Sequence, residues 1–200
     1  MKKWIRYVIL SAGAVAVCFL YAHIDKGHNV YDIATDNKSY VSANIKGDSF
    51  VSQSFRCTED CIDGISLKLL IGGEAKEGEL HYRLLDESGQ ELHHGVYPIE
   101  QIKSERINKI MFDKTVESTR DNVYKISLKA EGLGEGASLG IYYDPIGKKT
   151  GDLEVNGKKT EGTLVLRWIT HRFDAETFIV TLGIIVYFVA FFKILYRLFS

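Results

Sequence analysis

Two cysteines four residues apart are the first candidates for chemistry in this sequence. Cys57 and Cys61 fall at the joint between two predicted strands, and on the oxidising side of a membrane such a pair is expected to form a disulfide. Redox catalysis favours the tighter Cys-x-x-Cys spacing at the start of a helix, which is absent here. Zinc needs two more ligands, and His81, His93 and His94 supply them only if folding brings them close. We therefore predict a disulfide and neither a metal ion nor another cofactor.

A second group of residues has the chemistry of a sugar-binding site. Tyr82 and Arg83 lie on one predicted strand, and His93 and Tyr97 lie on the next. Their rings offer stacking surfaces and their polar groups offer hydrogen-bond donors. His93 and His94 are adjacent on a strand, so at most one of them points inward. The alternative is that these aromatic residues pack in the core or are scattered over the surface.

Catalytic residues are not identified in the chain. Gly47-Asp48-Ser49 resembles the nucleophile block of the GDSL hydrolases, but that chemistry needs a downstream Asp-x-x-His, which does not follow here. The 26 Asp and Glu residues are so many that adjacency alone identifies no acid and base pair. The sequence therefore predicts a protein that is not an enzyme.

The elements that hold these residues are predicted to be strands. Apolar and polar residues alternate along 65–71, 80–84 and 124–128, which indicates strands with one buried and one wet face. Asn156-Gly157 is the strongest hairpin turn in the chain. We predict an all-β fold, a jelly-roll-like antiparallel β-sandwich, with further strands at residues 50–56, 91–99, 109–112, 139–143, 153–155 and 163–169.

Two apolar segments flank this predicted sandwich. Residues 7–22 and 177–192 carry no charge and are long enough, with their flanks, to cross a bilayer as helices. We expect an N-terminal anchor at 1–23, a stalk or edge strand at 24–48, the sandwich at 49–171 and a C-terminal transmembrane helix at 172–200. Trp4, Trp168 and Phe173 are candidate membrane-interface residues, although Trp168 can equally be a core residue. The first segment also fits a cleaved secretory signal.

The distribution of charge suggests an orientation in the membrane. Between Asp25 and Glu176 the chain has 20 Lys and Arg against all 26 acids, which leaves a net charge of −6, and the other five bases lie outside this range. Basic ends favour the cytoplasmic side, so both termini are expected inside and residues 24–175 outside the membrane. A nucleic-acid partner is not expected, because a phosphate-binding face needs clustered bases.

The order of the motifs resembles a known kind of domain. The motifs are QSF at 53–55, ISLKL at 65–69, GELHYRLLD at 78–86, VYKISL at 123–128, GDLEVNG at 151–157 and GTLVL at 162–166. Residues 50–169 thus resemble the extracytoplasmic jelly-roll domain, similar to carbohydrate-binding modules and galactose-binding-like domains, of polytopic glycosyltransferase-like membrane proteins in Gram-positive bacteria. This chain has two apolar segments where those proteins have many helices.

The resemblance implies a function without assigning any ligand residue. It implies a bacterial cell-membrane protein that recognises a saccharide, or a lipid-linked saccharide, as an accessory in envelope glycan assembly. Any glycosyl transfer would then belong to a partner. The alternative is a structural or regulatory subunit that docks onto a larger membrane glycosyltransferase or transporter, to which the Ala12 and Ala16 face would offer a close approach.

Overall fold

A computed structural model describes residues 3–73, 77–147 and 150–199. Lys2, one of the bases behind the predicted orientation, lies outside these ranges. The chain forms two compact units, one made of residues up to Lys26 together with those from His171 onward, and the other of Gly27–Thr170. Strands β1 (His23–Asn29) and β13 (Leu166–Phe173) each contain residues of both units.

The first unit contains the two apolar helices that the sequence predicts. Helix α1 spans Lys3–Tyr21 and α2 spans Ala175–Phe199, and both are long and apolar enough to cross a membrane. Trp4 is 61% exposed near the start of α1. Phe173 stacks on Phe19 with ring centroids 5.4 Å apart. The exposure of these apolar side chains is consistent with a membrane protein.

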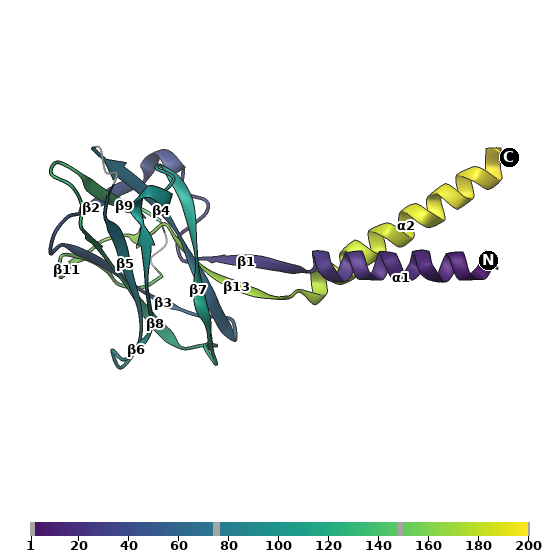
Figure 1. Cartoon of the computed structure of the whole chain (residues 1–200), viewed down its shortest axis with the longest axis horizontal. Helices are drawn as coiled ribbons and strands as arrows, with labels where there is room; N and C mark the ends of the chain where they lie inside the picture. Colours follow the sequence, from purple (N-terminus) through teal and green to yellow (C-terminus); the bar gives the residue numbers. More distant parts are fainter. Residues whose placement is uncertain (1–2, 74–76, 148–149, 200) are drawn as a thin grey trace. The chain divides into compact units, whose positions relative to one another are not determined.

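The second unit is a sandwich of two antiparallel sheets (Figure 1). The six-stranded sheet has the order β11-β10-β3-β8-β5-β6, and in the other sheet β1-β13-β4-β9-β12 is joined by β2 beside β9 and β7 beside β4. Together with the two helices, this confirms the predicted fold class. The remaining bounds are β2 (Val41–Ile45), β3 (Phe50–Arg56), β4 (Cys61–Gly72), β5 (Glu79–Asp86), β6 (Glu91–Pro98), β7 (Arg106–Glu117), β8 (Val123–Glu131), β9 (Ser138–Asp144), β10 (Leu153–Val155), β11 (Lys158–Thr160), β12 (Thr163–Leu164) and the 3-10 turns η1 (Asn37–Ser39) and η2 (Ile99–Gln101).

The core lies between the two sheets and follows the predicted alternation. On β8, Ile126 and Leu128 are fully buried while Ser127 between them is only half-buried. Leu67 and Leu69 of β4 belong to the same apolar cluster from the opposite sheet. Each such side chain contributes about 1.5–3 kcal/mol by leaving water, so burial of one face fixes which side chains point outward.

Trp168 lies in this core and is not at a membrane interface. Its side chain is 6% exposed and stacks between Phe55 and His28, at 5.4 Å and 5.3 Å between ring centroids. On β13 the alternation places Trp168 on the same inward face as Leu166, which explains its burial. The expectation that Trp168 anchors the interface is therefore wrong, and the alternative of a core residue is correct.

The predicted strand at 163–169 is divided in the structure. The backbone N–H of Val165 donates to Tyr142 O of β9, and Val165 O accepts from Lys68 N of β4. The chain therefore changes its partner from β9 to β4 at Val165, which separates β12 from β13.

The Asn156-Gly157 turn yields a stability prediction. Gly157 has φ +73°, and Asn156 has φ +53°, so the turn joins β10 to β11 in the left-handed region as expected from the sequence. Gly157→Ala should lower the free energy of unfolding by about 1–2 kcal/mol, because a Cβ disfavours this backbone conformation. Gly134→Ala is the control, since a Cβ there meets nothing within 4 Å and its φ is not positive. Thermal unfolding that ranks the two variants in the opposite order would contradict this account of the turn.

Candidate functional site

The outer face of the six-stranded sheet carries rows of polar side chains set by strand register. Ser127 of β8 pairs with Arg83 of β5, and Arg83 pairs with His94 of β6. In the next row, Lys129 lies between Phe50 of β3 and His81 of β5. Because cross-strand partners stand about 5 Å apart on one face, these residues form a continuous surface.

A hollow of about 400 Å³ lies over these two rows and is the candidate functional site. Hydrogen-bond donors and acceptors surround one aromatic ring, a combination typical of sites for polar ligands. The residues that line it are Asp48, Phe50, His81, Arg83, Ser127, Lys129 and Glu131. A smaller hollow of about 220 Å³ adjoins it and shares His81 and Arg83.

The polar groups of the hollow lie close to one another. Lys129 Nζ lies 3.1 Å from Glu131 Oε1 and 3.4 Å from Asp48 Oδ1, and His81 Nε2 lies 3.7 Å from Glu131 Oε2. The hydrogen bond with Glu131 raises the pKa of Lys129, and the same bond lowers the pKa of Glu131. Both groups are therefore charged at neutral pH, and the hollow presents hydrogen-bond donors beside acceptors.

The four residues predicted to bind a ligand lie on two faces of the sheet. Arg83 points outward, with its side chain 67% exposed and its Nε 3.7 Å from Glu91 Oε2. Tyr82 and His93 point inward, with 5% and 9% exposure, and Tyr97 packs against the core. The prediction that only one of His93 and His94 points inward is confirmed, because the side chain of His94 is 73% exposed. The structure thus brings Tyr82 close to His93 and separates both from Arg83.

Tyr82, His93 and Phe112 form an aromatic cluster between the sheets. Phe112 of β7 stacks on His93 at 4.2 Å and on Tyr82 at 5.7 Å between ring centroids. Tyr82 lies across Gly95, where an added Cβ would come within 2.2 Å of the phenol oxygen. Burial raises the pKa of Tyr82 and lowers that of His93, while Asp113 beside His93 works in the opposite direction on the histidine. This arrangement fits packing of the core, which is the alternative that the sequence left open.

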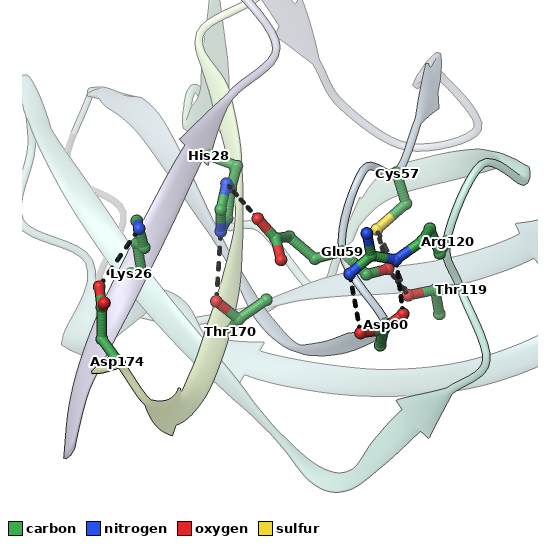
Figure 2. Close-up of polar contacts among 9 residues, drawn as sticks. All are labelled: Lys26, His28, Cys57, Glu59, Asp60, Thr119, Arg120, Thr170 and Asp174. Carbon is green, nitrogen blue, oxygen red and sulfur yellow. Dashed lines mark hydrogen bonds and ion pairs between the residues drawn. The ribbon is translucent and has the colours of Figure 1, made fainter. Parts of the chain in front are cut away.

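The structure does not support the predicted disulfide, because neither Cys57 nor Cys61 is part of a disulfide bond. Figure 2 shows the Sγ of Cys57 directed at Thr119, 3.4 Å from its Oγ1, and the same sulfur lies 3.3 Å from Glu59 O. The Sγ of Cys61, on β4, lies 3.4 Å from Asp63 Oδ2. The two sulfur atoms therefore contact different neighbours and are not bonded to each other. The four-residue spacing in the sequence wrongly predicted a bond between them. The turn is held by the Arg120 and Asp60 pair, whose two hydrogen bonds are 2.6 Å and 2.9 Å long.

A hydroxyl, an imidazole and a carboxylate also lie in order near this turn. His28 Nε2 is 3.2 Å from Thr170 Oγ1, and His28 Nδ1 is 3.7 Å from Glu59 Oε1 (Figure 2). Thr170 is fully buried, so a substrate cannot reach its hydroxyl in this conformation. The Thr170 hydroxyl instead provides a polar partner for the His28 ring, which stacks on Trp168. The arrangement therefore fits a structural role.

Arg83 is the one residue of the hollow that the sequence analysis predicted to bind a saccharide. Alternation places His81 on the same outward face as Arg83, but Lys129 and Phe50 come from strands far away in the chain. Only the strand order β3-β8-β5 joins them, and periodicity does not supply that order.

Comparisons with known proteins do not assign a family. No family model and no curated protein sequence matches the chain. Among solved structures, an active-site mutant of a family two carbohydrate esterase from Clostridium thermocellum is similar with 8% identity and a TM-score of 0.30, over 70% of this chain and 33% of that one. The VP2 subviral particle of infectious bursal disease virus gives 9% identity and a TM-score of 0.30, over 73% of this chain and 40% of that one. The chain thus spans less than half the length of either protein, and neither similarity assigns a function.

The different burial of the two cysteines leads to a labelling prediction. Cys61 is partly exposed and should react with iodoacetamide in the folded protein without any reductant, while buried Cys57 should react only after unfolding. Peptide mass spectrometry before and after reduction distinguishes the two sites. Protection of both cysteines that disappears on reduction would contradict the structure and restore the disulfide.

Burial of His93 predicts that acid weakens the fold. The ordinary pKa of histidine is 6.5, and burial lowers the pKa of folded His93 below this value. The unfolded chain therefore binds this proton more readily, so the stability contributed by neutral His93 is lost as the pH falls from 6.5 toward the lowered value. His93→Gln should flatten the pH dependence of the free energy of unfolding more than His94→Gln does, because burial of the His93 ring is the largest cause of the lowered pKa. Equal slopes for wild type and His93→Gln would refute this assignment.

Proposed function

We propose that this chain is a membrane-anchored binding protein whose sandwich recognises a saccharide at the hollow on the six-stranded sheet. The observation that carries the proposal is the composition of that hollow. Sugar hydroxyls both donate and accept hydrogen bonds, and the lining offers donors from His81, Arg83 and Lys129 beside acceptors from Asp48 and Glu131. Phe50 adds a ring against which the apolar face of a sugar packs.

The ion pairs of the hollow support binding of a polar ligand. Lys129 and His81 both lie within 4 Å of Glu131 before any ligand arrives, so less side-chain freedom is lost on binding. Arg83 is the most exposed of the basic side chains in these pairs and has the freedom to approach a ligand. A hollow of this volume on the sheet surface suits the end or side of a glycan chain.

The two apolar helices support a membrane context for the proposed function. Both would cross a cell membrane, with both termini in the cytoplasm and residues 24–175 outside, facing a saccharide or lipid-linked saccharide of a bacterial envelope. In this role the chain is an accessory without catalysis of its own, and a separate glycosyltransferase or transporter does the chemistry. No nucleic acid takes part.

The alternative of a regulatory subunit rests on the face of α1. Tyr7, Ser11, Ala12, Val15 and Ala16 line an apolar groove on this helix, in which the small residues would allow another helix to approach closely. Crosslinking in native membranes that captures a fixed partner helix at this face, together with no saccharide binding, would favour this alternative.

Mutation of Arg83 tests the saccharide site. Glycan-array screening of the full-length protein identifies a ligand, and calorimetry then measures its affinity for each variant. Arg83→Ala should weaken binding by about 10- to 100-fold, because a hydrogen bond to a charged group contributes about 1.5–3 kcal/mol. Arg56→Ala is the matched control on the same sheet, six residues beyond Phe50 on β3 and thus about 20 Å along the strand. Equal loss in both variants, or no saccharide bound at millimolar concentration, would count against the proposal.

A further inference from the structure

Another hollow, of about 250 Å³, lies in the first unit where its strands meet its helices. Two bases, Lys26 and Arg172, and two acids, Asp174 and Glu176, line it. The remaining lining residues are Ile24, Phe173 and Ala175. Its volume is below the roughly 300–1,000 Å³ of sites that enclose a whole drug-sized ligand, so it suits a smaller group. The balance of two bases against two acids distinguishes it from a simple anion site.

The contacts around this hollow hold it in a defined shape. Asp174 Oδ1 accepts hydrogen bonds from Glu176 N at 3.0 Å and Thr177 N at 3.3 Å, which caps the first turn of α2. Lys26 Nζ donates to the other oxygen, Asp174 Oδ2, at 3.2 Å, as Figure 2 shows. The backbone of Asp174 also donates to Ala22 O at 2.9 Å. These bonds join the chain that leaves α1 to the chain that enters α2.

The hollow is expected at the depth of lipid headgroups. Helix α2 has 25 residues and α1 has 19, which correspond to about 37 Å and 28 Å and match a hydrocarbon core of about 30 Å. Beside the hollow, Phe19, His23 and Phe173 form an aromatic cluster with centroid distances of 4.5 Å to 5.4 Å, typical of a membrane interface. The ends of both helices next to Ala22 and Asp174 would therefore lie where phospholipid headgroups begin.

We infer that this hollow binds the headgroup of a phospholipid that carries both a phosphodiester and a primary ammonium, as phosphatidylethanolamine does. Lys26 and Arg172 would bind the phosphate, and Glu176 would accept hydrogen bonds from the ammonium. Hydrogen bonds to Thr177 N and Lys26 lower the pKa of Asp174, so its carboxylate stays charged and helps to exclude a purely anionic headgroup. The quaternary ammonium of phosphatidylcholine has the same charge but no N–H to donate. This inference rests on the membrane position of the helices proposed above and is independent of the saccharide site.

Native mass spectrometry of retained lipids tests the inference. Full-length protein is reconstituted in nanodiscs with equal amounts of phosphatidylcholine and phosphatidylethanolamine, transferred to detergent, and the lipids that remain bound are counted. We expect phosphatidylethanolamine to be retained about fivefold over phosphatidylcholine, since an exposed contact between opposite charges contributes up to about 1 kcal/mol. Glu176→Gln should remove this preference, and Glu87→Gln, an exposed acid in the sandwich, should not.

Further variants keep the test clear if one of them folds poorly. Lys26→Arg should still retain phosphatidylethanolamine, and Lys26→Gln should not. Lys46→Gln is the control and should retain it as the wild type does. Equal retention of the two lipids in wild type, or a preference for phosphatidylglycerol when that lipid is added, would overturn the inference while leaving the membrane position intact. Failure of the protein to insert into nanodiscs would overturn both, and neither result bears on the saccharide site.

Discussion

Burial of one face of each sheet is the constraint on which the rest of the sandwich depends. Once Leu80 and Leu84 of β5 and Ile126 and Leu128 of β8 are buried, a slip of one residue in either strand would bring charged groups into the core. Register is therefore fixed, and with it the outer rows that bring Arg83 beside Ser127 and Lys129 beside His81. The candidate site is thus a consequence of core packing on the opposite face of the same strands.

The local sequence pattern was sufficient to predict the strands in which apolar and polar residues alternate. It was also sufficient to predict the turn that joins β10 to β11. It was insufficient for β1, whose residues His23, Asp25, Lys26 and His28 are polar, because this strand is stabilised by pairing with β13 and not by its own burial pattern. It was also insufficient for the break at Val165, where the change of partner is a property of the sheet. The side-chain period of two predicted that His93 and His94 diverge, and the structure agrees.

The candidate site shows the same division between local and long-range information. Arg83 was identified because its chemistry is visible in the sequence, while Asp48, Phe50 and Lys129 acquire their place only through the order of β3, β8 and β5. The disulfide prediction was not supported, because the spacing of two cysteines in the sequence does not determine where their side chains point. The two sulfur atoms point at different neighbours, Thr119 and Asp63. The prediction that Trp168 lies at the membrane interface was wrong, because strand alternation points its side chain into the core.

Hydrogen–deuterium exchange of the full-length protein, with and without a saccharide that it binds, tests the central claim most directly. Bound ligand should slow exchange in peptides that cover β3, β5 and β8, since these strands carry the hollow. Exchange in β4 and β9 of the opposite sheet should stay unchanged. Protection confined to that opposite sheet, or to the edge where Tyr82 and His93 meet Phe112, would contradict the account.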